Sequence, residues 1–276
     1  EKFGLNASTI RYYEEIGLLE NVEHKDKYHR IYTDAHVDRL SAIECFKQAR
    51  LPLDEKVPIE ILVKGGERFS AIATTSKHNT NKYVVFLTKK GILKKSKLDD
   101  CSTNRSTGLR VITLDADDEI RSILVMNEER IGIMSKAGNI IVVETKNIAP
   151  IGRTAKGRKG MNLNAGDEVV CARVIDKDTK SIVSISANGY MKRTTINDFN
   201  TTGLNTKGNK IQKLKDANDS MVDFAPVHDE KNLIVVASRA QIKLGMDEVA
   251  VSGRTTIGTK SMKVKDNDKI IGFSLS

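Results

Sequence analysis

Residues 130–143 read RIGIMSKAGNIIVV, in which two short runs of apolar residues flank a turn at Gly138. A glycine turn between two β-branched runs is typical of a β-hairpin. The same pattern recurs as YVVFLTKKGILKKS (83–96), SIVSISANGYMKRT (181–194) and LIVVASRAQIKLGM (233–246). The turn glycines Gly91, Gly138 and Gly189 are 47 and 51 residues apart, and Gln241 takes the fourth turn position 52 residues later. This repetition predicts a fold assembled from similar β-units.

Each hairpin is followed by two further segments in a fixed order. The first is a small-residue, basic loop: NRSTG (104–108), GRTAKG (152–157), GLNTKG (203–208) or GRTTIG (253–258). The second is an acidic turn: LDADDE (114–119), LNAGDE (163–168), LKDAND (214–219) or VKDNDK (264–269). A period near 50 residues with about four strands is that of a propeller blade. We therefore predict a mainly β, propeller-like domain of four or five blades over residues 57–276.

Residues 1–56 have a different character, because their apolar residues follow helical spacing. The segment NASTIRYYEEIGLL (6–19) predicts a capped helix, and DAHVDRLSAIECFKQAR (34–50) predicts a second one. The polar segment between them, ENVEHKDKYHRIYT (20–33), is suited to a β-wing. The composition changes between Pro52 and Pro58, so we place the domain boundary at about residue 56. The prediction is a small N-terminal α-helical, winged helix-turn-helix domain, which we call the head.

The charge is unevenly distributed between these two parts. The whole chain carries +9, whereas residues 1–56 hold 9 Lys/Arg against 11 Asp/Glu, which leaves +11 for the remainder. A basic excess on one part of a protein favours a polyanionic partner through the release of counterions. Aromatic residues make up 5% of the chain and Trp is absent, which argues against stacking platforms for single-stranded nucleic acid. The charge therefore favours a polyanionic partner, and the alternative that composition alone leaves open is ordinary solubility charge.

The basic side chains of the repeats gather in the hairpins and in the loops that follow them. Because stacked repeats place equivalent positions around one rim, these side chains are expected to form a curved positive band. Glycines in the loops would let a phosphate backbone approach closely, and no repeat offers a base-reading set, so we expect sequence-independent binding. The alternative is that these residues are solvated turn residues without a partner. The predicted DNA contacts are Lys94, Lys95, Arg105, Arg110, Arg153, Lys156, Arg158, Lys159, Lys192, Arg193, Lys207, Lys210, Arg254 and Lys260.

The segments GRTAKGRKGMNLNAGDEVV (152–170) and SANGYMKRTTINDF (186–199) resemble the repeat unit of the C-terminal domains of the DNA gyrase and topoisomerase IV A subunits. The resemblance covers about residues 57–276. It implies a β-pinwheel whose basic outer face bends or wraps duplex DNA. The family's full-wrapping box, rich in glutamine, arginine and glycine, is not evident in this sequence, and the segment nearest to it is GLNTKG (203–208). Bending or partial wrapping is therefore the expectation. The carried-over contacts are Arg153, Lys156, Arg158, Lys159, Lys192, Arg193, Arg254 and Lys260.

The N-terminal segment resembles another family, with STIRYYEEIGLL (8–19) as the nearest match to the DNA-binding module of MerR-family regulators. The resemblance implies a winged DNA-binding module, and the sequence departs from the family in lacking the long dimerisation helix and the effector region, so we expect a shortened module. It places Thr9, Arg11, Tyr12 and Tyr13 at the groove and the phosphates, and Arg30 and Tyr32 on the wing. Arginine reaches base edges or phosphates and tyrosine donates to phosphate, so these residue types suit the role. The alternative is that the two tyrosines are core aromatics.

Other classes of protein find little support in the sequence. The chain has no apolar run of about 18 residues and no secretory signal, and its three cysteines match no metal-ligand spacing. We expect reduced thiols, no cofactor and no metal, in a protein of the cytoplasm at the bacterial nucleoid. None of the six tyrosines has the context of a topoisomerase nucleophile, and no P-loop is present, so the chain is predicted not to be an enzyme.

Three functional hypotheses remain open at this point, beside the alternative that the two parts are fused and have no joint function. The first is a duplex-binding pinwheel that bends or wraps DNA. The second is a transcriptional regulator in which the head reads a promoter and the pinwheel assists. The third is an accessory subunit that delivers DNA to a type II topoisomerase partner.

Overall fold

The computed structural model describes residues 82–101, 109–263 and 268–276, together with positions 10, 11, 13, 14, 19, 22–24, 30–33, 36, 40, 70, 71 and 73. The chain divides into two compact units, Glu1–Ile72 and Ala73–Ser276. The predicted domain boundary near residue 56 lies outside the described residues and stays a prediction. The predicted class is confirmed, since the described part of the second unit is built from short β-strands.

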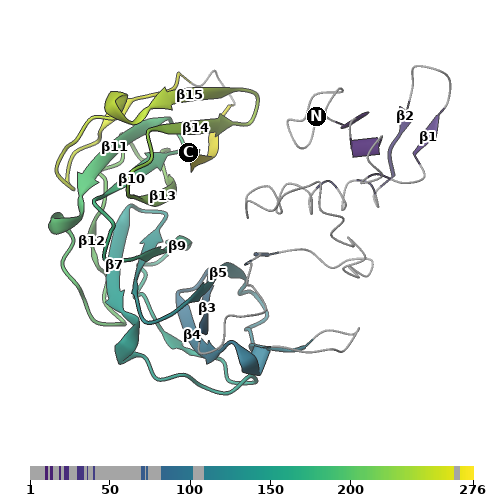
Figure 1. Ribbon diagram of the computed structural model, residues 1–276, viewed down its shortest axis with the longest axis vertical. Coiled ribbons are helices and arrows are strands. Elements are labelled where there is room, and N and C mark those ends of the chain that lie inside the picture. Colours follow the sequence, from purple (N-terminus) through teal and green to yellow (C-terminus); the bar gives the residue numbers. More distant parts are fainter. Residues whose placement is uncertain are drawn as a thin grey trace. The chain divides into compact units, whose positions relative to one another are not determined.

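Four antiparallel sheets, which we call blades I to IV, follow one another along an arc in the second unit (Figure 1). Each blade has a hairpin at its centre: β3 (Tyr83–Thr88) with β4 (Ile92–Lys97), β6 (Arg130–Ser135) with β7 (Asn139–Glu144), β10 (Ser181–Ser186) with β11 (Tyr190–Thr195), and β14 (Asn232–Ala237) with β15 (Gln241–Gly245). An inner strand pairs with the first strand of each hairpin: β5 (Ile120–Met126), β9 (Val169–Ile175), β13 (Met221–Val227) and β17 (Ile270–Leu275). A short 3-10 turn ends each hairpin: Asp99–Cys101, Thr145–Asn147, Ile196–Asp198 and Met246–Glu248.

The fourth strand of a blade comes from the following repeat. Strand β8 (Arg158–Lys159) follows the blade II hairpin in sequence, yet it pairs with β4 of blade I. In the same way, β12 (Asn209–Lys210) pairs with β7 of blade II, and β16 (Thr259–Lys260) pairs with β11 of blade III. Blade IV has three strands, and among the described residues nothing pairs with the outer edge of β15. Neighbouring blades are therefore interlocked by the exchange of an edge strand.

The core lies between the blades, because alternate residues of a strand point to opposite faces of its sheet. In β10, Ile182 packs in the cluster shared with blade II, and the next residue, Val183, packs in the cluster shared with blade IV. Both side chains are 0% exposed, and full burial of such a side chain is worth about 1.5–3 kcal/mol. Gly132 on β6 belongs to this packing, since a Cβ there would lie 2.9 Å from the ring of Phe224 on β13.

The last blade leaves one face of its sheet open. Ile234 of β14 takes the place that Val183 takes in β10, yet it is 38% exposed, against 0% for Val183. Lys243 and Ser274 pair with Ile234 from the two neighbouring strands, so they lie on the same face, and both are exposed. No further blade covers this face among the residues that the structure describes.

Carboxylates of the acidic turns form hydrogen bonds with the hairpin turns. The carboxylates of Asp118, Asp167 and Asp219 each accept a hydrogen bond of 3.0 Å from a main-chain N–H in a hairpin turn. The donors are Lys90, Ala137 and Asn188. Turn residues Gly91, Gly138 and Gly189 have φ between 81° and 84°, a left-handed conformation that favours glycine. The hairpin turn and the acidic turn therefore recur together in the sequence because the same hydrogen bond joins them in three blades.

The first unit contains the expected helix and wing. Residues 10, 11, 13 and 14 are helical, and β1 (Glu23–His24) pairs with β2 (Arg30–Ile31) as an antiparallel ribbon within the predicted wing. Tyr13 is 1% exposed, and it is buried as Leu19 and Leu40 are. No helix among the described residues is long and apolar enough to cross a membrane.

Candidate nucleic-acid interface

A lysine occurs at the same position on each exchanged edge strand. Lys159 of β8, Lys210 of β12 and Lys260 of β16 are all exposed, and each pairs with the first residue of the second hairpin strand. The strand exchange therefore carries one lysine to the outer edge of blades I, II and III. Because the blades are related by repetition along the arc, the three lysines lie on equivalent edges.

The side chains of two of these lysines contact residues of the neighbouring hairpin. Nζ of Lys210 donates to the carbonyl of Ala137 at 2.7 Å, and Nζ of Lys260 lies 5.7 Å from the centre of the Tyr190 ring. Both side chains stay exposed, so each ammonium keeps donors for a phosphate. Lys159 has no side-chain partner among the described residues.

The loops before the edge strands add further cations. Gly152 and Gly253 each open a tight turn, closed by hydrogen bonds of 3.2 Å from the N–H groups of Ala155 and Thr256. Lys156 forms a 2.7 Å ion pair with Asp115, so its charge is partly neutralised. Six other predicted contacts are at least partly exposed, and their side chains have no partner in the described part of the chain. They are Arg110, Arg153, Arg158, Arg193, Lys207 and Arg254.

Three predicted contacts require correction, because Lys94, Lys95 and Lys192 are at most 2% exposed. Nζ of Lys192 donates to the carbonyls of Gly253 and Arg254 at 2.6 and 2.7 Å. Burial and the charge of Arg254 together lower the pKa of Lys192 to about 8, against the opposite effect of Asp198. An ammonium that is enclosed by the protein and bonded to its own loop is not available to a phosphate.

The other two buried lysines have comparable surroundings. Nζ of Lys94 donates to the carbonyl of Val111 at 2.6 Å and to that of Arg153. Nζ of Lys95 donates to the carbonyl of Thr145 at 3.0 Å and lies 3.9 Å from the centre of the Tyr83 ring. Burial lowers the pKa of both lysines. Comparison of the repeats could have revealed Lys94 and Lys192, because the second hairpin has the apolar Ile141 at their position.

Two exposed lysines escaped the sequence prediction. Lys213 and Lys263 lie three residues after Lys210 and Lys260, at equivalent positions of successive repeats, and both are exposed. Neither side chain has a partner among the described residues. The signal was present in the sequence as a Lys-x-x-Lys spacing after two of the loops.

The first unit supports only part of the predicted head contacts. Arg11 is exposed and Tyr32 is 37% exposed, as a DNA contact requires. Arg30 forms a 2.6 Å ion pair with Glu14. Tyr13 is a buried core aromatic, so the prediction that Tyr13 contacts the DNA groove is corrected. Thr9 and Tyr12 of the head and Arg105 of the first loop lie outside the described residues.

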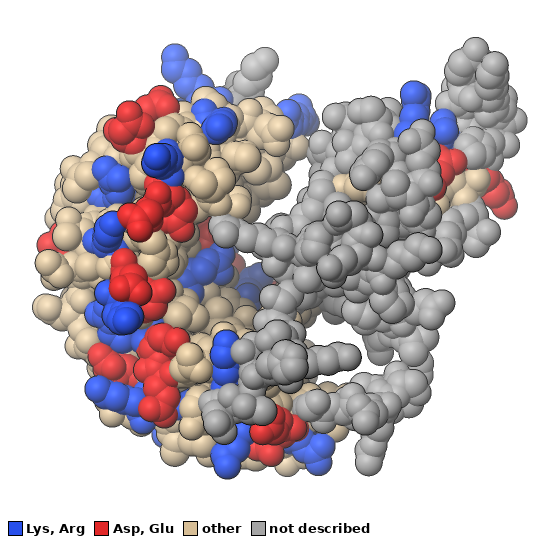
Figure 2. Space-filling model, viewed as in Figure 1, with Lys and Arg blue, Asp and Glu red and all other residues tan. Residues whose placement is uncertain are grey.

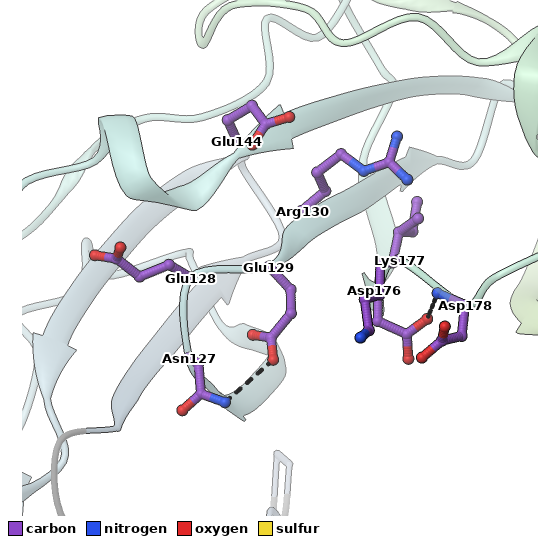
Figure 3. Close-up of a pocket in the computed structure, with 9 residues that line it drawn as sticks. Asn127, Glu128, Glu129, Arg130, Glu144, Asp176, Lys177 and Asp178 are labelled. Atoms are coloured by element: carbon purple, nitrogen blue, oxygen red, sulfur yellow. Dashed lines mark hydrogen bonds between the residues drawn. The ribbon is translucent and has the colours of Figure 1, made fainter.

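Acidic side chains mark the surfaces that do not suit DNA. A hollow of about 580 Å³ lies where loops of blades I and II meet, and Figure 3 shows its lining. Its carboxylates are Glu128, Glu129, Glu144, Asp176 and Asp178, against the two cations Arg130 and Lys177. This excess of carboxylates repels phosphate. Figure 2 shows that cations and carboxylates stand side by side on the viewed face of the arc, so this face carries no continuous positive patch.

No metal chemistry is indicated in the described residues, where no group of three or more His, Cys, Asp or Glu side chains could hold an ion. Cys171 is buried, and burial raises the pKa of its thiol. Its Sγ donates to Oδ1 of Asp223 at 3.3 Å, so it is placed as a core side chain.

Comparison with known proteins bears on both units. A family model described as DNA gyrase C-terminal domain, beta-propeller matches residues 82–127, 133–176, 180–228 and 242–276, more than half of the chain. A second model, described as MerR HTH family regulatory protein, matches residues 1–55. The matches agree with the two resemblances seen in the sequence.

Similar proteins give the same picture. The DNA gyrase A subunit of Lawsonia intracellularis is 31% identical over 211 residues, which are 75% of this chain and 26% of that protein. The DNA gyrase A subunit of Helicobacter pylori is 30% identical over 222 residues, 79% of this chain and 27% of that protein. The chain thus spans about a quarter of the length of these relatives.

Solved structures share the fold. The C-terminal domain of DNA topoisomerase IV superposes with a TM-score of 0.70 at 21% identity, over 77% of this chain and 67% of the other. The DNA gyrase A C-terminal domain gives a TM-score of 0.68 at 23% identity, over 78% of this chain and 73% of the other. With four interlocked blades and a family match that covers most of them, the chain belongs to the family of DNA gyrase C-terminal, beta-propeller domains.

Proposed function

We propose that the four blades bind duplex DNA along their outer edges and bend or partly wrap it, without catalysis by this chain. The observation that carries the proposal is the repeated lysine of the exchanged strands, Lys159, Lys210 and Lys260. Arginines of the neighbouring loops support it, since their side chains have no partner within the described ranges. The relatives, which are DNA gyrase A subunits, make duplex DNA the favoured polyanion.

The energetics favour an interface without sequence preference. Duplex DNA carries about one charge per 1.7 Å of its axis, and each neutralised phosphate releases counterions. Bending 20–30 base pairs by 40–90° costs about 1–6 kcal/mol, which contacts spread over several blades can offset. Cations on successive blades of an arc reach phosphates on a bent duplex that a straight duplex would leave out of reach. Because lysine ammonium groups on the edge strands would contact phosphates rather than bases, binding should depend on salt more than on sequence.

The proposal includes a setting for the chain. We place it with duplex DNA at the bacterial nucleoid in the cytoplasm, where its partner is a type II topoisomerase. The relatives that support this setting are about four times longer than the matched region. Any reaction on DNA would thus be carried out by that partner, and this chain would hold the duplex.

A topology assay tests the proposal. The protein is bound to nicked circular DNA, the nick is sealed, the protein is removed and the linking number is read on a gel. Wrapping predicts a linking-number shift that grows with protein concentration and disappears at high salt. No binding at low salt would contradict the proposal, and binding without a shift would limit it to bending.

The match of residues 1–55 to a regulatory family favours a second candidate, a transcriptional regulator in which the head reads a promoter. A nuclease footprint separates the two candidates. One short protected site supports the regulator, whereas long protection without a preferred site supports wrapping. Co-purification with a gyrase-like partner would favour the delivery of DNA to a topoisomerase.

A further inference from the structure

Two buried lysines hold the loops that present the proposed DNA contacts. On β11, Nζ of Lys192 donates to the carbonyls of Gly253 and Arg254 at 2.6 and 2.7 Å, and it lies 3.5 Å from Oγ1 of Thr256. On β4, Lys94 takes the equivalent place and donates to the carbonyl of Arg153. In both blades the loop belongs to the following repeat. Each lysine therefore ties an exchanged loop to the blade that receives it.

The other two blades show that the sheet does not need this lysine. Blade II has Ile141 at the same position, 0% exposed, and its hairpin and edge strand form with the same pairing. In blade IV the strand register puts Ile242 there, opposite Val235, and no loop is docked against it among the described residues. A buried lysine ammonium is thus found in the blades that receive a Gly-Arg-Thr loop, whereas the hairpin also forms without it. Burying an ammonium is costly, so its retention in blades I and III points to a role in the loop.

We propose that Lys192 and Lys94 are positioning residues, which fix the 253–256 and 152–155 turns so that Arg254 and Arg153 meet the phosphate backbone. This inference rests on the proposed binding of duplex DNA. With its carbonyls bonded inward to Lys192, the turn keeps Arg254 beside the edge strand that carries Lys260. A fixed turn does not have to be ordered when DNA binds, and the saved entropy appears as affinity.

The electrostatics around Lys192 provide a distinctive signature. The charged groups that face it are Arg254 from the loop and Asp198 from the 3-10 turn. Burial and Arg254 together bring the pKa of Lys192 to about 8. A phosphate bound at Arg254 offsets that positive charge and favours the protonated lysine, so binding takes up a proton. Affinity for DNA should therefore fall as pH rises through about 8.

The test compares Lys192→Ile with Lys243→Ile in the full chain. The first change copies the residue that blade II already has, so the fold should be kept, and the second removes the same charge from a hairpin on which no described loop docks. Binding to a fluorescent duplex is measured by anisotropy between pH 7 and pH 9. We expect Lys192→Ile to weaken binding at pH 7 by about five- to tenfold and to flatten the pH profile. Lys243→Ile should keep the profile of the parent protein.

Amide hydrogen exchange gives a second readout. Residues 252–260 should exchange faster in Lys192→Ile, while the β10–β11 hairpin should keep its protection. Equal affinities and equal pH profiles for the two variants would overturn the inference. Arg254→Ala separates this failure from a failure of the proposed function. If Arg254→Ala weakens binding and Lys192→Ile does not, only the positioning role is lost, whereas absence of binding by the parent protein removes the proposed function itself.

Discussion

Nε2 of His228 lies 2.9 Å from Oδ1 of Asp176, and this contact joins the loop after β13 to the loop after β9. Burial disfavours the charged imidazole, but the hydrogen bond and the charge of Asp176, together with Glu230, outweigh it and raise the pKa of His228. A histidine with a raised pKa stabilises the fold below its unfolded pKa, near 6.5, and this contribution is lost as pH rises through the higher folded value. The link between blades II and III is therefore pH-dependent.

Substitution of His228 by Gln should remove this dependence. Both partners are about one third exposed, so the pair is worth only about 0.5 kcal/mol. We expect Tm to fall by about 1–2 °C at pH 6 and to stay unchanged at pH 8.5, as measured by thermal unfolding. Lys231→Gln removes a cation from the same loop without touching Asp176, and it serves as the control. An equal loss at both pH values would contradict the assignment.

The pair formed by Arg173 and Asp223 should contribute more to stability. Nη2 of Arg173 donates to both carboxylate oxygens of Asp223 at 2.7 and 2.9 Å, across the inner strands β9 and β13. Asp223 is mostly buried, and it also accepts from the Cys171 thiol. Asp223→Ala should cost about 2 kcal/mol, which lowers Tm by about 4–8 °C. Asp229→Ala, at an exposed pair with Lys180, should change Tm by less than about 2 °C.

The edge strand of blade II should depend on Gly208. This residue has φ of 72°, and a Cβ there would collide with the carbonyl oxygen of Ile140 on β7. Gly208→Ala should cost about 1–3 kcal/mol and release β12 from its blade. Hydrogen exchange at the amide of Ile211, which bonds to the carbonyl of Gly138, would report the release. Gly203→Ala in the same loop meets nothing within 4 Å, and its exchange should match that of the parent protein.

The three edge-strand lysines should set the salt dependence of DNA binding. Replacement of Lys159, Lys210 and Lys260 by Gln removes three expected phosphate contacts, which should reduce the slope of log K against log salt by about 2.7. Titrations between 50 and 200 mM salt would measure it. The triple variant Lys177→Gln, Lys180→Gln and Lys231→Gln removes the same charge from loops at the other end of the strands. An equal reduction in both triple variants would mean that net charge, and not the edge, determines binding.

The hairpins could be predicted because their signals are local, whereas the sequence left the number of blades at four or five. Apolar residues around Gly91, Gly138 and Gly189 mark the first three hairpins, and the repeat supplies the stacking. The strand exchange could not be predicted, since a two-residue strand such as β8 has no period and pairs with residues more than 60 positions away. Nor did any local pattern indicate the open edge that β15 has among the described residues.

For the candidate interface, the sequence identified the cations but not which way they face. Lys94 and Lys192 look like surface charges in a polar hairpin, yet carbonyls of an exchanged loop allow their burial. That compensation depends on a contact about 60 residues away, which composition and periodicity do not report. Lys159 and Lys260, in contrast, flank glycine-rich loops and stay exposed as predicted. Contacts with DNA by any of these residues stay a prediction.

The exchange of edge strands gives the row of blades a polarity, because each of blades I to III is completed by the repeat that follows it. Blade III takes β16 from the repeat that follows it, and nothing in the described residues of blade IV depends on a later one. Deleting the last repeat would therefore damage the blade before it, whereas adding one would complete β15 and disturb no existing pairing. A further unit after blade IV would lengthen the path available to a duplex that binds as we propose.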